Sequence, residues 1–376
     1  MGISVKFRWG GGFKGNVAAK IQLAHKFEEI ISLENLFSAW QEFLVGKKSK
    51  RDVQIFARDL ADNILALHED LSNKTYEHGG YEDFYVNDPK RRHIHKAAVR
   101  DRLLHHAVYR ILYPFFDKTF IADSFSCRLG KGAHRAINRF RAVAFRASQN
   151  HAKTCWALKC DIKKFFASID HEILLNILKK YIPDKNIIWL LENIIDSFRT
   201  NCHPRENGDP VVDCLDSRLR GNDKNAGLPL GNLTSQLFAN VYMNVFDQWV
   251  KHKLKAKYYL RYADDFVFFS SQRAWLLNIV PQIENFLVEK LQLTLHPEKI
   301  ILKTVTSGVD FLGWVHFPHH RVLRKITKCR MLLRIRKDPK SETLQSYLGL
   351  LKHGNTFKIR RQLLINYWLW QDLFNC

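Results

Sequence analysis

Two adjacent carboxylates between two apolar runs constrain the fold of this chain more than any other feature. Tyr-Ala-Asp-Asp occupies residues 262–265, with Tyr-Tyr-Leu at 258–260 before it and Phe-Val-Phe-Phe at 266–269 after it. Aromatic and β-branched runs predict strands, and a short acidic break between two strands predicts a tight hairpin turn. Asp264 and Asp265 then concentrate negative charge at one point, where they either bind a divalent cation or act only as turn formers.

A third carboxylate, Asp161, favours the cation. It directly follows Cys-Trp-Ala-Leu-Lys-Cys at 155–160, a mostly apolar run that predicts a buried strand. A carboxylate there is costly unless it is paired or bound to a metal ion. A strand-end Asp with a hairpin Asp pair suits two-metal phosphoryl transfer, in which one Mg²⁺ activates a 3′ hydroxyl and the other steadies the triphosphate. Asp170 is predicted to cap the next helix rather than to bind metal.

The segments Asp-Ile-Lys-Lys-Phe-Phe at 161–166 and Tyr-Ala-Asp-Asp at 262–265 resemble the two catalytic motifs of reverse transcriptases. The resemblance extends from about Tyr81 to about Asn366 and includes Phe-Ser-Cys-Arg-Leu-Gly-Lys-Gly-Ala-His at 125–134. It implies an α+β right-hand polymerase fold, with fingers, a palm built on an antiparallel sheet and a helical thumb.

The resemblance also implies the residues of the reaction. Two Mg²⁺ ions, with Mn²⁺ as a substitute, would be held by Asp161, Ile162, Asp264 and Asp265. Lys299 stands where the family keeps a lysine proposed as the proton donor to pyrophosphate, and Lys303 is its rival. The primer grip would be formed by Phe311, Leu312, Gly313 and Trp314.

Other positions resemble the part of the family's site that binds the nucleotide. Phe166, five residues after Asp161, would be the steric gate that excludes a ribonucleotide 2′-hydroxyl, with core packing as the alternative. Lys90 and Arg92 lie in a basic, strand-like stretch and would hold the triphosphate, with a solvated charged loop as the alternative.

The loop Gly-Leu-Pro-Leu-Gly-Asn-Leu-Thr-Ser-Gln at 227–236 indicates which kind of reverse transcriptase this is. Most members have Gln at the position of Leu230 and Pro at that of Gln236, on either side of Gly231. Leu-Gly-Asn-x-Thr-Ser-Gln resembles the enzymes of diversity-generating retroelements, which copy a template RNA with errors at adenines. Leu230 cannot hydrogen-bond the nucleotide, which removes roughly 0.5–1.5 kcal/mol of positioning. Alternatively, Leu230 only packs under the active site.

This resemblance implies four partners: template RNA, a primer or cDNA, dNTPs, and a small, basic, oligomeric accessory variability protein. Two alternatives stay open. One is a group II intron-like or defence-associated reverse transcriptase of ordinary fidelity, and the other is an inactive RNA-binding scaffold on a decayed polymerase fold. The intact Asp161, Asp264 and Asp265 argue against decay.

The charge of the chain favours a polyanionic partner. Its net charge is +22, and residues 321–361 hold thirteen Lys and Arg against Asp338 and Glu342. Interleaved with apolar residues, these cations predict a helical thumb that follows phosphates, with a membrane-surface helix as the rival. The sequence has no 18-residue apolar run, signal peptide or Cys-x-x-Cys pair, so we expect a cytoplasmic protein without a membrane partner or a zinc site.

The predicted domains follow one another along the chain. A basic, Gly-containing and disordered segment (1–25) precedes a helical extension of two helices (26–78), fingers and palm (79–315) and a basic thumb (316–376). The polar, turn-rich segment 202–224 resembles translated bacterial intergenic repeats and predicts an inserted, exposed and dispensable loop. A template-guiding basic loop is the alternative.

Overall fold

The computed structural model describes residues 21–87, 91–198 and 225–374, and it divides into two compact units. The first unit comprises residues 1–118 and 170–241, and the second comprises residues 119–169 and 242–376. The predictions for residues 1–20, for Lys90 and for the 202–224 insertion lie outside the described residues. No helix within the described ranges combines the length and apolar character that crossing a membrane requires.

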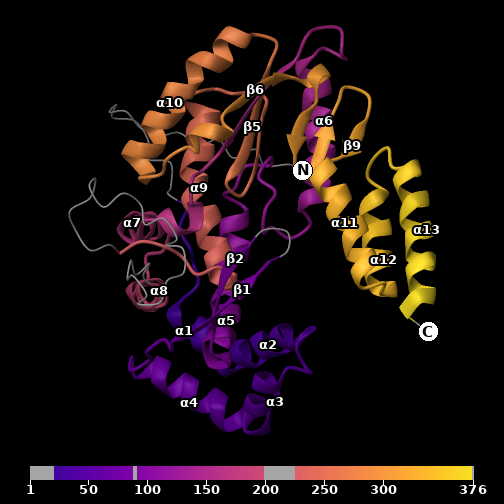
Figure 1. Ribbon diagram of the computed structural model, residues 1–376. Coiled ribbons are helices and arrows are strands. Elements are labelled where there is room, and N and C mark those ends of the chain that lie inside the picture. The colour runs from indigo at the N-terminus through magenta and orange to yellow at the C-terminus, as the bar shows by residue number, and fades with distance from the viewer. Residues whose placement is uncertain (1–20, 88–90, 199–224, 375–376) are drawn as a thin grey trace, which may run out of the picture. The chain divides into compact units, whose positions relative to one another are not determined.

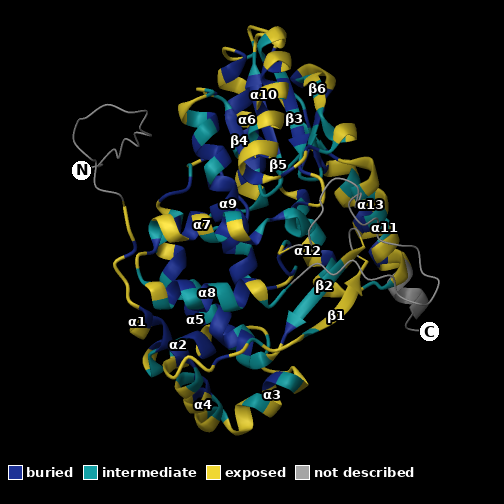
Figure 2. Ribbon diagram, turned by 90° about the vertical axis from the view of Figure 1, so that its left-hand side faces the viewer, coloured by how far each residue is buried: buried dark blue, intermediate teal, exposed yellow. Residues whose placement is uncertain are grey.

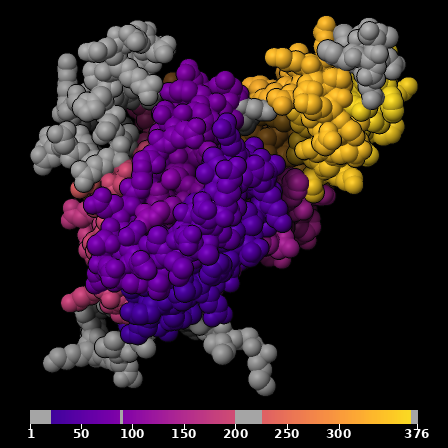
Figure 3. All heavy atoms as spheres, turned by 90° about the horizontal axis from the view of Figure 1, so that it is seen from below, coloured from indigo at the N-terminus to yellow at the C-terminus, as the bar shows by residue number. Residues whose placement is uncertain are grey.

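The N-terminal part of the first unit is built from helices. Two helices were expected here, whereas the structure has four: α1 (Phe27–Ile31), α2 (Leu33–Leu44), α3 (Arg51–Arg58) and α4 (Leu60–Ser72). The first break falls at Ser32, whose hydroxyl accepts a hydrogen bond from the backbone of Asn35 (3.2 Å) and so begins α2. Asn35 in turn donates to the backbone of Ala107 (3.2 Å), which ties α2 to α5 (Val99–Asp117). Indigo and purple atoms of this part form one continuous surface in Figure 3.

The first unit also contains a two-stranded hairpin and a second helical group. Strands β1 (Tyr81–Val86) and β2 (Arg92–Ala97) pair antiparallel, and α7 (His171–Tyr181) packs on α8 (Lys185–Asp196). Asp170 accepts a hydrogen bond from the backbone of Ile173 (2.9 Å), so the predicted helix cap is confirmed. Helix α9 (Leu233–His252) begins in this unit and continues into the second.

A four-stranded antiparallel sheet forms the centre of the second unit (Figure 1). Its order is β4-β5-β3-β6, where the strands are β3 (Trp156–Asp161), β4 (Tyr259–Tyr262), β5 (Asp265–Ser270) and β6 (Ile301–Thr304). Helix α6 (Ala133–Ala147) packs on β4 and β5, and α10 (Arg273–Leu291) packs on β3 and β5. The central strands are therefore largely buried (Figure 2), as their apolar sequences predict.

The C-terminal part of the second unit consists of a small sheet and three helices. Strands β7 (Val309–Phe311), β8 (Trp314–His316) and β9 (Arg321–Leu323) form an antiparallel meander. Helices α11 (Lys325–Lys337), α12 (Ser341–Leu351) and α13 (Phe357–Phe374) follow. On α11, Met331 and Ile335 are buried whereas Arg334 and Arg336 are exposed, so the helix has the amphipathic, basic character expected from its sequence. Helices and antiparallel sheets together confirm the α+β class.

Candidate active site

The hairpin predicted at residues 262–265 joins β4 to β5. Tyr262 pairs with Asp265, and Ala263 and Asp264 form the turn between them. Ala263 adopts φ +54°, the left-handed region, which residues other than glycine enter at an energetic cost. The turn is therefore strained at the residue before the two carboxylates.

The register of the sheet brings the third carboxylate to this turn. Asp161, the last residue of β3, lies directly opposite Asp265, the first residue of β5. Residues directly opposite in an antiparallel pair have Cβ atoms about 4.5–5.5 Å apart. Asp161 and Asp265, together with Asp264 next to Asp265 in the sequence, concentrate negative charge at this end of the sheet.

Two lysine ammonium groups face the carboxylates. Lys299 Nζ lies 3.1 Å from Asp161 Oδ1, and Lys159 Nζ lies 3.1 Å from Asp265 Oδ2. Lys303, the rival of Lys299, is exposed on β6 opposite Ala157, at the other end of β3. Sequence reasoning had not identified Lys159, although its spacing of two from Asp161 on a strand places both residues on one face.

Burial raises the pKa of Asp265 to about 7, despite the opposing effect of the nearby Lys159 ammonium group. Asp265 Oδ1 is buried and has no hydrogen-bond partner within the described part of the chain. No three or more His, Cys, Asp or Glu side chains among the described residues form a group that could hold a metal ion. The carboxylate oxygens of Asp161, Asp264 and Asp265 nevertheless suit a divalent cation. Asp265 Oδ1 in particular is a buried acceptor with no hydrogen-bond partner among the described residues.

The proposed steric gate also belongs to the second unit. Phe166 lies in a 3₁₀ turn (Phe165–Ser168) and is half-buried, whereas its neighbour Phe165 is buried. Ile162 is buried directly after Asp161, where its backbone pairs with Leu295. Phe166 thus keeps part of its ring accessible, as contact with a nucleotide sugar requires.

The proposed primer-grip segment is the hairpin between β7 and β8. Phe311 pairs with Trp314, and both side chains are buried in the hydrophobic core of the second unit. Leu312 and Gly313 form the turn with φ +50° and +83°, a pair of positive values that suits a type I′ turn. The aromatic side chains therefore support the hairpin, and Leu312 and Gly313 in its turn remain partly exposed.

In the first unit, the loop at 227–236, whose last four residues form the start of α9, is held against β2. The backbone N–H of His95 donates to the carbonyl of Leu230 (3.0 Å). Gly231 has φ +126°, and a Cβ atom there would lie 3.2 Å from Ile94 Cγ2 and 3.3 Å from the carbonyl oxygen of His95. Glycine is thus required by both conformation and space.

Side chains of the first unit fix the loop at further points. Thr234 hydrogen-bonds the buried His105 (2.7 Å), and His171 hydrogen-bonds the carbonyl of Gly227 (2.7 Å). Leu230 and Gln236 remain partly exposed. Arg92 is exposed at the first residue of β2, so its guanidinium group is accessible to an anion.

The chain is similar to known proteins over much of its length. A family model described as reverse transcriptase (RNA-dependent DNA polymerase) matches residues 87–316. YkfC of Escherichia coli (strain K12) is 22% identical over 300 residues, which cover 71% of this chain and 72% of YkfC. The group II intron-encoded protein LtrA of Lactococcus lactis subsp. cremoris is 23% identical over 200 residues, or 52% of this chain.

The chain spans 29% of the length of LtrA. A solved structure of telomerase from Candida albicans, in complex with the TWJ fragment of telomeric RNA, has a TM-score of 0.49 at 11% identity and covers 79% of this chain and 55% of its own. The family model spans more than half of the 376 residues. The chain therefore belongs to the reverse transcriptase family, the RNA-dependent DNA polymerases.

Proposed function

We propose that this chain copies a template RNA into cDNA, with errors concentrated at template adenines, as the reverse transcriptases of diversity-generating retroelements do. The polymerase part is carried by the register of the palm sheet, which places Asp161 opposite Asp265 at the turn that holds Asp264. The family match and the similarity to a group II intron-encoded protein support it.

Reverse transcriptases use divalent metal ions, and Mg²⁺ is the ion we propose here. Asp161, Ile162, Asp264 and Asp265 would hold two such ions, which when bound activate the primer 3′ hydroxyl and neutralise phosphate charge. Lys299 is held at Asp161 by a hydrogen bond of 3.1 Å, and its ammonium group would donate a proton to the leaving pyrophosphate. Arg92 would bind the triphosphate through its forked guanidinium group.

The proposed infidelity rests on Leu230. Its carbonyl is already used by His95, and its half-buried aliphatic side chain can neither donate nor accept a hydrogen bond. An incoming nucleotide would lose one polar restraint there, whereas Phe166 would still exclude ribonucleotides by bulk. Phe166→Ala should therefore admit rNTPs while leaving the pattern of base errors unchanged.

The proposed partners are template RNA, a primer or the growing cDNA, dNTPs and a small basic accessory protein. Exposed cations on α11, among them Arg334, Arg336 and Lys337, would contact the phosphates of the nucleic acid. The domain boundaries expected from the sequence, with fingers and palm at 79–315 and the thumb at 316–376, remain part of this proposal.

The proposal is tested by primer extension on an RNA template with Mg²⁺ and dNTPs, followed by sequencing of the products. DNA synthesis with misincorporation concentrated opposite adenines would support both parts. Accurate synthesis would keep the polymerase and reject the retroelement class in favour of a group II intron-like enzyme, which the similarity to LtrA favours. Absence of synthesis, even with a candidate accessory protein present, would reject the polymerase in favour of an RNA-binding scaffold.

A further inference from the structure

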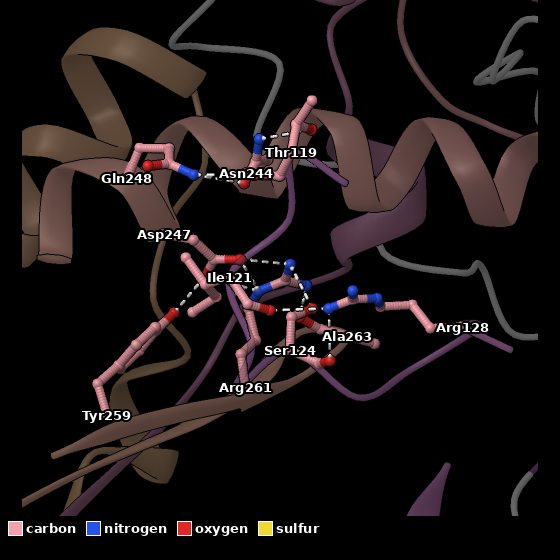
Figure 4. Close-up of polar contacts among 10 residues, drawn as sticks. All are labelled: Thr119, Ile121, Ser124, Arg128, Asn244, Asp247, Gln248, Tyr259, Arg261 and Ala263. Carbon is pink, nitrogen blue, oxygen red and sulfur yellow. Dashed lines mark hydrogen bonds and ion pairs between the residues drawn. The ribbon is translucent and has the colours of Figure 1, made fainter. Parts of the chain in front are cut away.

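A buried ion pair lies next to the turn of Ala263 and Asp264, inside the second unit (Figure 4). Arg261 on β4 and Asp247 on α9 are both 0% exposed. Arg261 Nε donates to Asp247 Oδ1 (2.9 Å), and Arg261 Nη2 donates to Asp247 Oδ2 (2.7 Å). The hydroxyl of Tyr259 also donates to Asp247 Oδ1 (2.7 Å), so the carboxylate is fixed from two residues of the same strand.

The third nitrogen of the guanidinium group reaches the turn itself. Arg261 Nη1 donates to the carbonyl of Ala263 (3.0 Å), the residue with φ +54°. Arg261 Nη2 also donates to Ser124 Oγ (3.1 Å), and the Arg261 backbone pairs with that of Asp123 and Phe125 (2.9 and 3.0 Å). Arg261 is therefore held at Nε, at Nη2 and along its backbone, while its Nη1 donates to the turn.

The stability of the protein gives little reason for this arrangement. Desolvation of two charges costs several kcal/mol each, and apolar residues of similar volume are often as stabilising as a buried ion pair. What an apolar replacement cannot supply is a directed hydrogen bond to a carbonyl. Ala263, the strained residue before Asp264 and Asp265, receives such a bond.

We propose that Arg261, anchored by Asp247, is a positioning residue for polymerisation: it holds Ala263 in the left-handed conformation and thereby orients the carboxylates of Asp264 and Asp265. The inference rests on the polymerase activity proposed above. Arg261 touches neither substrate nor metal in this scheme. It acts through the backbone of the turn.

The test is Arg261→Lys in the full chain, compared with Arg139→Lys. Arg139 forms a similar two-pronged pair with Asp123 (2.7 and 3.0 Å) in the same unit, on α6 rather than on the catalytic hairpin. A lysine at 261 keeps the charge near Asp247 but cannot reach both the carboxylate and the Ala263 carbonyl. We expect kcat to fall by about tenfold or more, with KM for dNTP unchanged, because misplaced catalytic groups lower the rate of the chemical step.

Two further readouts separate positioning from support of the fold. Affinity for Mn²⁺ alone, measured by electron paramagnetic resonance without nucleotide, should weaken in Arg261→Lys and stay at the wild-type value in Arg139→Lys. Addition of Ala263→Gly to Arg261→Lys should restore part of kcat, because glycine adopts a positive φ without the hydrogen bond. A loss of thermal stability alone would not be rescued in this way.

If Arg261→Lys does not fold, Asp247→Asn replaces it, because it keeps the shape of the partner and removes its charge. The same changes in kcat and Mn²⁺ affinity are expected, to a smaller extent. Wild-type kcat and Mn²⁺ affinity in a folded Arg261→Lys or Asp247→Asn protein would overturn the inference. A wild-type chain that makes no DNA would instead overturn the proposed function, so the two failures are distinguishable.

Discussion

Two backbone segments with positive φ, one in each unit, are stabilised in opposite ways. The turn between β4 and β5 has Ala263 at φ +54°, and its carbonyl accepts a hydrogen bond from the buried guanidinium group of Arg261. The loop at 227–236 has Gly231 at φ +126°, where a Cβ atom would crowd Ile94 Cγ2 and the carbonyl oxygen of His95. The strain of a positive φ is thus compensated by a hydrogen bond from a charged group in the first case. In the second case it does not arise, because glycine has no side chain.

The difference matters for function. A turn that accepts a hydrogen bond from a buried and anchored guanidinium group is restricted in its conformation, which would suit carboxylates that are proposed to hold metal ions. A loop held by a neutral backbone hydrogen bond, from His95 to Leu230, can change its side chains without loss of its anchor. We therefore expect substitutions at the turn to abolish DNA synthesis. Substitutions in the loop should instead change the KM for dNTP or the error rate.

The largest effect is expected from Asp264→Ala. Loss of this carboxylate should lower kcat by about a thousandfold or more, as is usual for a single catalytic residue. Binding of primer and template, measured by fluorescence anisotropy, should persist, because the cations proposed to contact phosphates lie elsewhere in the chain. Asp62→Asn, an exposed carboxylate on α4, is the control and should change neither quantity. Comparable activity in the two variants would remove Asp264 from the site.

An intermediate effect is expected from Gly231→Ala. A Cβ atom would approach Ile94 Cγ2 to 3.2 Å in a conformation that alanine rarely adopts, at a cost of about 1–3 kcal/mol. KM for dNTP should rise by about tenfold, because 1.4 kcal/mol corresponds to that factor, with a smaller change in kcat. Gly80→Ala provides the matched control, since a Cβ atom there meets nothing within 4 Å. Equal kinetics for the two variants would refute the requirement for glycine at 231.

A smaller effect, on the error rate rather than on the rate of synthesis, is expected from Leu230→Gln. A glutamine can hydrogen-bond the nucleotide, so errors at template adenines should fall by about two- to tenfold, which corresponds to 0.5–1.5 kcal/mol. Sequencing of cDNA from the same RNA template measures this directly. Leu228→Met, at a buried position of the same loop, should leave the error spectrum unchanged. An unaltered error rate in Leu230→Gln would contradict the proposed role of Leu230.

The last prediction concerns stability rather than activity, as a pH dependence at the turn. The pKa of Asp265 is raised to about 7 from an ordinary value of 3.8, chiefly by burial. Between these pH values the folded state keeps a proton that the unfolded state has lost, so the free energy of unfolding falls as pH rises through this window. Asp265→Asn lacks this contribution.

The melting temperature of metal-free Asp265→Asn should therefore increasingly exceed that of the wild type as pH rises from about 4 to about 7. Thermal melts in a chelator at several pH values check this, with Asp62→Asn as the control. A difference that stays constant across this range would show that Asp265 titrates normally.

Much of the site follows from local sequence. The hairpin at 262–265 lies between its predicted strands, and Asp170 caps α7 as expected. Four N-terminal helices were taken for two, because the five-residue α1 is too short to show a periodic pattern and because the apolar periodicity of α3 continues into α4 across Asp59. Lys299 and Lys303 could not be separated by spacing, because the answer depends on which end of β3 each one faces.

The family, and the strands that carry Asp161, Asp264 and Asp265, can be predicted from the sequence, because they depend on motifs and periodicities within a few neighbouring residues. The partners of the charged groups depend instead on the folded chain: Lys159 lies at Asp265, and Arg261 lies between Asp247 and the carbonyl of Ala263. A buried charge must be paired wherever packing brings a complementary group within hydrogen-bond distance. That choice is made by the register of the strands and the placement of α9, and neither can be seen in the order of the residues.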